Sequence, residues 1–175
     1  MDRPLNATAA SLLGFLHRGP MTGWDLVVVA QESIGGFWSL TQSQVYRELA
    51  AMERDGLIRA EKTGPRERKP FSLTEAGRSA FAEWLDREPG PENIRYPLLL
   101  TMVFGEYLAP ERLAEMLRDH QQMHERQLAS YLETAASHEL DGNRFALATL
   151  DFGIYYERAV IEWFNNLPAR LTRNT

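Results

Sequence analysis

The 175-residue sequence predicts a mainly α-helical chain with one small β-hairpin, an α+β first part followed by an all-helical second part. Apolar residues recur at helical spacing through most of the chain. The exception lies at 57–73, where two short segments flank the Gly-Pro and charged tip GPRER, as in a hairpin. The segment REPGPENIRYP at 87–97 is rich in proline and charge, and predicts a boundary between domains at 1–88 and 89–175.

Four helices are predicted in the first part, over residues 7–17, 23–34, 41–55 and 75–85. Gly19-Pro20 ends the first helix, and Thr22 can cap the second. Ser39 or Thr41 is the N-cap of the third, and Gly56 ends it. The hairpin of 57–63 and 69–73 separates the third helix from the fourth.

The third helix has two unlike faces. Val45, Leu49 and Met52 follow the i, i+4, i+7 spacing of a face packed on a core. The opposite face carries small and basic side chains: Ser43, Arg47, Ala50, Ala51 and Arg54. Periodicity alone leaves two interpretations open, a plain core helix or a helix whose outer face enters a groove.

Three helices, two strands and a helix, in that order, are the layout of a winged helix-turn-helix. One helix of that motif enters the major groove of DNA, and the hairpin contacts the backbone or the minor groove. Motifs within the first part resemble the PadR family of bacterial transcriptional regulators: GWDL at 23–26, GGFWS at 35–39, QVYRELAAMERDGLI at 44–58 and FSLTEAGR at 71–78. The resemblance covers about residues 7–86.

The sequence departs from the family at three positions. Trp24 and Phe71 stand where the family usually has tyrosine, and Met52 stands where it has leucine. All three keep a large apolar group, so the departures affect phenolic hydroxyl roles and not the fold. SIGGFW, QVYREL and TEAGRSAFAEWLD are most similar to the virulence-activator branch typified by AphA.

The resemblance implies DNA-binding residues in two places. Candidates in the third helix are Thr41, Gln42, Ser43, Gln44, Tyr46 and Arg47, and those in the hairpin are Lys62, Arg66, Arg68 and Lys69. Arg47 could pair with guanine, and Gln42 or Gln44 with adenine. Tyr46 is either structural or a phosphate contact. The basic hairpin is either a solvated turn or a set of phosphate contacts.

Charge bears on this interpretation. A net charge of -5 argues at first against a nucleic-acid partner. However, residues 1–90 carry 11 Lys and Arg against 12 Asp and Glu, whereas residues 91–175 carry 8 against 12. Segment 59–69 alone has a net charge of +3. The positive charge is therefore concentrated where it can reach DNA.

The second part predicts a homodimer. Residues 97–108 are apolar on nearly every side, a long helix runs from 110 to about 140, and a last helix spans 144–167. The last helix has two apolar faces, and a second copy of the chain in a C2 dimer is the simplest cover for the extra one. In the family that the chain resembles, the C-terminal helices dimerise. A dimer can place two recognition helices in successive major grooves, about 34 Å apart, on an inverted repeat.

Other chemistry has little support in the sequence. His120 and His124 have the spacing of metal ligands, but HExxH and a third ligand are absent, so we expect no metal or other cofactor. Buried in a dimer seam, the same pair could titrate near neutral pH. No catalytic motif is present, so an enzyme is not expected. The absence of cysteine excludes disulfides and thiol chemistry.

The sequence therefore predicts a cytoplasmic, homodimeric PadR-like transcriptional regulator, with a repressor expected. Its partners would be double-stranded DNA and a second copy, and not a membrane, because no apolar run is long enough to span one. The family resemblance implies a small aromatic effector, although the AphA branch works without one. The alternative is a small-molecule-sensing or partner-binding helical dimer with weak or no sequence-specific DNA binding.

Overall fold

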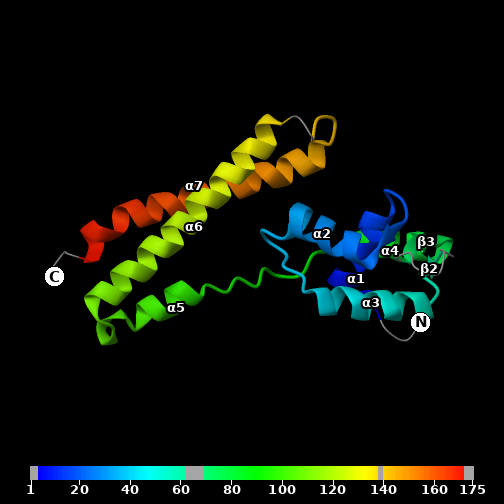
Figure 1. Cartoon of the computed structure of the whole chain (residues 1–175), viewed down its shortest axis with the longest axis horizontal. Coiled ribbons are helices and arrows are strands. Elements are labelled where there is room, and N and C mark those ends of the chain that lie inside the picture. The colour runs from blue at the N-terminus through cyan, green and yellow to red at the C-terminus, as the bar shows by residue number, and fades with distance from the viewer. Residues whose placement is uncertain (1–3, 62–68, 138–139, 172–175) are drawn as a thin grey trace. The chain divides into compact units, whose positions relative to one another are not determined.

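The computed structural model describes residues 4–61, 69–137 and 140–171, with side chains up to 167. The chain forms two compact units, Met1–Glu92 and Asn93–Thr175 (Figure 1). No helix in the described ranges combines the length and the apolar character needed to cross a membrane.

The first unit is helical with one small sheet. Its elements are α1 (Ala7–Leu16), β1 (Met21–Thr22), α2 (Gly23–Ile34), α3 (Gln42–Arg54), β2 (Ile58–Ala60), β3 (Pro70–Leu73) and α4 (Glu75–Leu85). This confirms the predicted class. The antiparallel sheet has the order β1-β3-β2, so it holds one strand more than the predicted hairpin. Two residues are too few for strand periodicity to show in β1.

Side-chain caps start the helices of this unit. Asn6, Thr22, Thr41 and Thr74 each accept a hydrogen bond from the backbone N–H three residues on. Thr41, and not Ser39, is therefore the N-cap of α3. Gly56 has φ +74° just beyond the end of α3, which is the left-handed conformation that glycine adopts most readily.

The core of the first unit lies between α1, α2, α3 and the sheet. It consists of Ala9, Leu12, Leu13, Phe15, Leu16, Leu26, Ala30, Val45, Leu49, Met52, Leu57, Ile58 and Leu73. The predicted inner face of α3 is thus confirmed. Burial of that face fixes which residues of α3 point outward.

Thr74 joins the sheet to the end of α3. Its hydroxyl lies 2.8 Å from the carbonyl oxygens of both Gly56 and Leu57, and its backbone N–H donates to Leu57 at 3.1 Å. Gly77 then packs so closely that a Cβ there would lie 2.1 Å from the Leu57 oxygen. The strands are therefore held at a fixed position on α3.

The second unit consists of helices alone in its described residues: α5 (Pro97–Val103), a 3-10 turn (Gly105–Tyr107), α6 (Pro110–Ala136) and α7 (Arg144–Leu171). α6 and α7 pack side by side (Figure 1). α6 ends at Ala136, earlier than the predicted 140, and Gly142 takes φ +85° in the connection. Asn143 then caps α7 by accepting from the N–H of Ala146 at 3.1 Å.

A buried polar pair lies between α6 and α7. His124 Nδ1 is 2.5 Å from a Glu157 carboxylate oxygen, and the two side chains are only 12% and 8% exposed. Burial, followed by the charge of Glu157, raises the pKa of the Tyr96 and Tyr131 hydroxyls. His124 thus has a carboxylate partner from the facing helix.

Candidate nucleic-acid interface

The first turn of α3 presents polar side chains to solvent. Thr41, Gln42 and Ser43 are exposed, and Gln44 is half-buried. The Gln44 amide oxygen accepts from the Thr41 N–H at 2.8 Å, while the Thr41 hydroxyl accepts from the Gln44 N–H at 3.3 Å. A glutamine needs both its oxygen and its NH₂ to pair with adenine, so this capping box favours Gln42 over Gln44 for that role.

Arg47 lies on the outer face of α3, with its side chain 68% exposed. Its guanidinium Nε is 3.9 Å from the carboxylate of Glu48, whose own side chain is buried. Ser43 and Ala50, which flank Arg47 on this face, are exposed and small. The arginine can therefore extend without competing for space.

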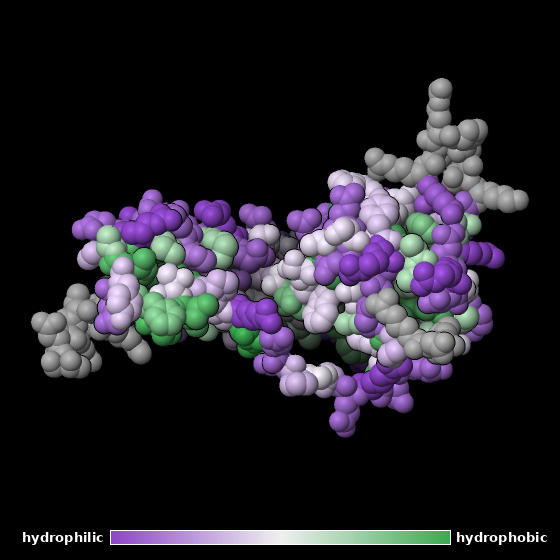
Figure 2. Space-filling model, turned by 90° about the horizontal axis from the view of Figure 1, so that it is seen from below, coloured by the Kyte–Doolittle hydropathy of each residue, from purple (hydrophilic) through white to green (hydrophobic). Residues whose placement is uncertain are grey.

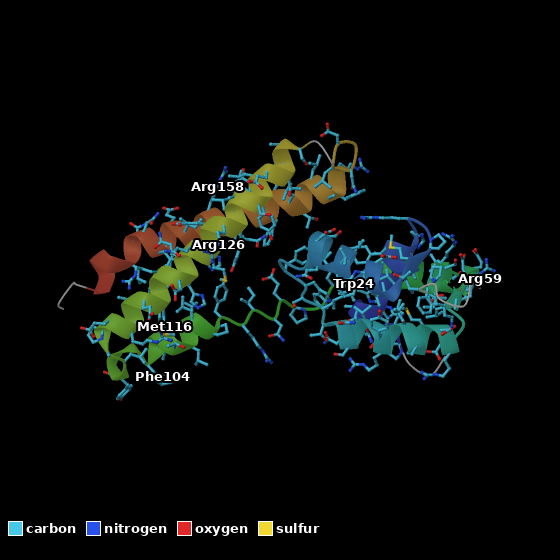
Figure 3. The ribbon with its side chains drawn as sticks, viewed as in Figure 1. Trp24, Arg59, Phe104, Met116, Arg126 and Arg158 are labelled. Atoms are coloured by element: carbon cyan, nitrogen blue, oxygen red, sulfur yellow. The ribbon has the colours of Figure 1, made fainter. Side chains whose placement is uncertain are left out.

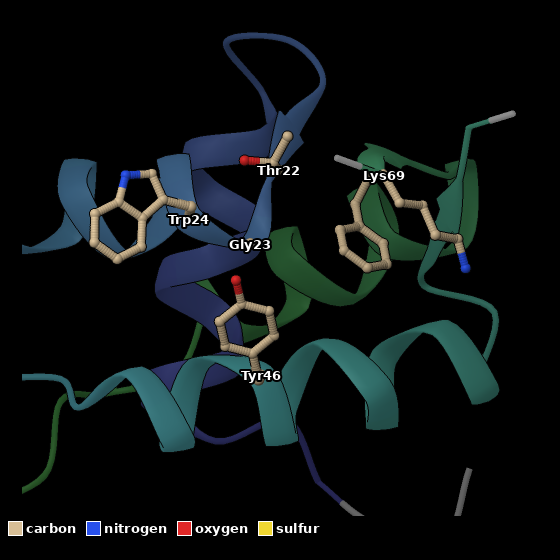
Figure 4. A pocket seen from close by; sticks show the side chains of 6 residues that line it. Thr22, Gly23, Trp24, Tyr46 and Lys69 are labelled. Carbon is tan, nitrogen blue, oxygen red and sulfur yellow. The ribbon is translucent and has the colours of Figure 1, made fainter. Parts of the chain in front are cut away.

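Tyr46 connects α3 to the start of α2. Its ring packs on Gly23, where a Cβ would lie 2.7 Å from the ring and 3.1 Å from the hydroxyl oxygen. Figure 4 shows the ring rising from α3 toward the first turn of α2, and the residue remains 45% exposed. The packing establishes a structural role, and the partial exposure of the residue leaves a phosphate contact open as well.

A cavity of about 370 Å³ lies beside Tyr46, lined by Thr22, Gly23, Trp24, Tyr46, Lys69 and Phe71 (Figure 4). Its walls come from the start of α2, from α3 and from β3. The residues at the start of α2 are absent from the predicted DNA-binding set. Thr22 and Asp25 form a capping box there, which starts α2.

Lys69 stands where the chain enters β3. Its ammonium lies 2.9 Å from the Glu53 carboxylate on α3 and 5.7 Å from the centre of the Phe71 ring. The other basic candidates of the hairpin, Lys62, Arg66 and Arg68, lie outside the described residues. Of the predicted hairpin residues, Lys69 is therefore joined to the last turn of α3 by its contact with Glu53.

Two family models match the sequence. The model described as "Transcriptional regulator PadR-like family" matches residues 12–83, and the one described as "Virulence activator alpha C-term" matches residues 94–172. Among curated proteins, the "Negative transcriptional regulator PadR" of Bacillus subtilis (strain 168) is 27% identical over 94% of this chain and 97% of its own length.

Solved structures agree in fold. Bacillus subtilis PadR in complex with operator DNA has a TM-score of 0.78 and 23% identity, over 94% of this chain and 99% of that one. The same protein in complex with p-coumaric acid has a TM-score of 0.75 and 22% identity, over 96% and 100%. The Vibrio cholerae virulence activator AphA has a TM-score of 0.74 and 27% identity, over 94% and 98%.

The motifs of the first unit, the helical second unit and these matches agree with one another. The match of residues 94–172 to the "Virulence activator alpha C-term" model and the similarity to AphA also support the placement near the virulence-activator branch. The chain belongs to the PadR-like family of transcriptional regulators and is not an enzyme.

Proposed function

We propose that this regulator acts as a homodimeric repressor that binds an inverted-repeat operator. Residues 1–88 bind DNA, with α3 in the major groove and the hairpin on the backbone or in the minor groove. Residues 89–175 dimerise. The name of the Bacillus subtilis relative, a negative regulator, supports repression, and its complex with operator DNA supports the partner. Action on chromosomal DNA places the protein in the cytoplasm.

The observation that carries DNA binding is the outer face of α3. Gln42, Ser43 and Arg47 are exposed on the helix that a winged helix inserts into the groove, while the opposite face is sealed in the core. Arginine and glutamine are the side chains that read guanine and adenine edges. Arg47 and Gln42 are therefore the proposed base contacts.

Dimerisation is supported by apolar surface on the second unit. One face of α7 packs on α6 and includes Ile154 and Phe164, at 7% and 4% exposed. On the other face, Phe145, Phe152 and Tyr155 are 66% to 71% exposed. α5 also exposes apolar side chains, among them Leu100 at 65% and Val103 at 73%, and Figure 3 shows Phe104, just after α5, at the edge of the unit. Figure 2 shows hydrophobic residues gathered on this unit. Surface of this kind is typical of an interface.

Replacement of Arg47 by alanine tests the base contact. The purified chain is titrated with duplexes from the upstream region of its own gene, and with a scrambled duplex, over a range of salt. We expect selective binding by the wild type and a loss of about 1–3 kcal/mol on the operator in Arg47→Ala, the range of a bidentate base contact. Arg78→Ala removes the same charge from α4 and serves as the control.

Two outcomes would contradict this proposal. If the wild-type chain shows no preference for any upstream duplex, the alternative of a helical dimer without sequence-specific DNA binding gains support. If Arg47→Ala weakens binding to operator and scrambled duplex equally, Arg47 contacts phosphate and does not read a base.

A small aromatic effector is a second proposal, supported by the complex of Bacillus subtilis PadR with p-coumaric acid. An effector that releases operator binds the DNA-free protein more tightly than the complex. Addition of p-coumaric acid should then raise the melting temperature of the DNA-free chain and weaken operator binding. If neither changes, this compound is not an effector.

A further inference from the structure

The ammonium of Lys69 already has an anionic partner in the DNA-free protein. Glu53 Oε1 lies 2.9 Å from Lys69 Nζ, and the two residues are 16 apart in sequence. The contact therefore joins the base of the hairpin to the last turn of α3. Both side chains are partly exposed, so solvent, salt and a DNA phosphate can all reach the pair.

Two features of its surroundings also stabilise the Lys69 ammonium beside Glu53. α3 ends at Arg54, so the Lys69 ammonium lies close to the end of the helix where the macrodipole is negative. The Phe71 ring, 5.7 Å away, adds a cation–π contact. Figure 4 shows the Lys69 side chain running away from Tyr46 and Trp24, although the residue also lines their cavity.

Two arginines of α3 also lie near carboxylates, at longer distances than Lys69. Arg47 lies 3.9 Å from Glu48, and Arg54 lies 3.6 Å from Asp55. Those pairs join sequence neighbours, whereas Lys69 and Glu53 come from different elements. Such pairing matches the near balance of charge in residues 1–90, which contain 11 basic and 12 acidic residues.

We infer that Glu53 competes with the DNA backbone for Lys69 and so lowers the affinity of this regulator for DNA. The inference rests on the proposed function, because it requires the hairpin to meet phosphate. When Lys69 moves to a phosphate oxygen, its ion pair with Glu53 breaks and the Glu53 carboxylate is left near a second anion. Both effects oppose binding, and neither depends on base sequence.

Replacement of Glu53 by glutamine removes the competitor and keeps the size of the side chain. Glu53→Gln should bind duplexes about two- to fivefold more tightly at low salt, the range of an exposed ion pair. The gain should be equal on operator and scrambled duplexes. It should shrink between about 0.05 M and about 0.3 M salt, because exposed charges are screened.

A double-mutant cycle links the effect to Lys69. In a Lys69→Gln background, Glu53→Gln should change the affinity little, because no ammonium remains to be released. Glu83→Gln, on the exposed face of α4, changes the net charge equally and should leave the affinity within about twofold of the wild type, as is usual for an exposed charge. Unchanged melting temperatures show that the variants are folded.

Four results would overturn the inference. Weaker binding by Glu53→Gln would mean that Glu53 orients Lys69 for DNA. A gain that persists without Lys69, or that Glu83→Gln reproduces, would mean a general charge effect. If the wild type binds no duplex, the proposed function itself fails. Wild-type binding with no response to Glu53→Gln rejects the competition alone.

Discussion

At the scale of single residues, the position of the hairpin depends on Gly77. A Cβ at this position would lie 2.1 Å from the backbone oxygen of Leu57 and 2.8 Å from a methyl group of Leu73. Backbone atoms cannot move aside as a flexible side chain can, so α4 would have to separate from the sheet. The close approach therefore holds only with glycine.

Gly77→Ala should lower the free energy of unfolding of the first unit by about 2–3 kcal/mol, in the range of overpacked cores. Urea unfolding followed by circular dichroism measures this loss. Gly90→Ala, where a Cβ would meet nothing within 4 Å, is the matched control and should stay within about 0.5 kcal/mol of the wild type. A Gly77→Ala variant as stable as the control would show that α4 can shift at no cost.

Some residue positions could be predicted from the sequence and others could not. Val45, Leu49 and Met52 were placed in the core because three apolar residues at helical spacing define one face. Glu48 lies among them, only 3% exposed, and was not predicted. It lines a small cavity together with Leu5 and Ala9, which lie far away in the sequence. No local pattern encodes such a tertiary contact.

At the scale of elements, the predictions were right where a helix is marked by a capping residue or by a repeating pattern of apolar residues. The caps at Thr22 and Thr41 could be predicted, because the cap residue and the residues after it are local in sequence. β1 was missed, since its pairing with β3 joins Met21 to Phe71, 50 positions further on. The end of α6 was predicted too late. The turn between Leu140 and Asn143 is short and relies on the positive φ of Gly142, so little in the sequence marks where the helix stops.

The pairing of α6 with α7 provides a test at this scale. His124→Ala removes the partner of the buried Glu157 carboxylate, which should lower the free energy of unfolding of the second unit by about 3 kcal/mol. Thermal unfolding measures the change. His120→Ala, one turn earlier on α6, is the control and should cost less. Combined replacement of His124 and Glu157 by leucine should recover much of the loss, because no unpaired polar group remains.

A different result would assign the pair another role. If His124→Ala is as stable as His120→Ala, water reaches Glu157 and replaces the imidazole. If the double leucine variant is less stable than His124→Ala, the pair stabilises the second unit through the fit of its side chains between the helices and not through its hydrogen bond.

At the scale of the whole molecule, the family, the winged layout and the helical second part could all be predicted. Each depends on motifs and on the order of elements. The contacts that organise the candidate site could not. Tyr46 packs on Gly23 from another helix, and Lys69 meets Glu53 across 16 residues, so both contacts require the folded chain. The assignment of bases to Arg47 and Gln42 stays a prediction.

The assembly of two chains can be tested through the exposed face of α7. Phe152 is 66% exposed and stacks on Tyr156 with ring centres 6.4 Å apart, so its replacement leaves the buried face of the helix intact. Phe152→Asp places a charge where the second copy would have to bury it, which should convert the dimer to monomer at micromolar concentration. Sedimentation velocity measures the change, and Phe152→Leu, which keeps an apolar side chain, should remain dimeric. Since an inverted repeat is bound by two linked recognition helices, the Asp variant should also lose at least about a hundredfold in operator affinity while its first unit stays folded. A dimeric Phe152→Asp would place the interface elsewhere on the second unit, and a monomer with full operator affinity would show that one copy suffices.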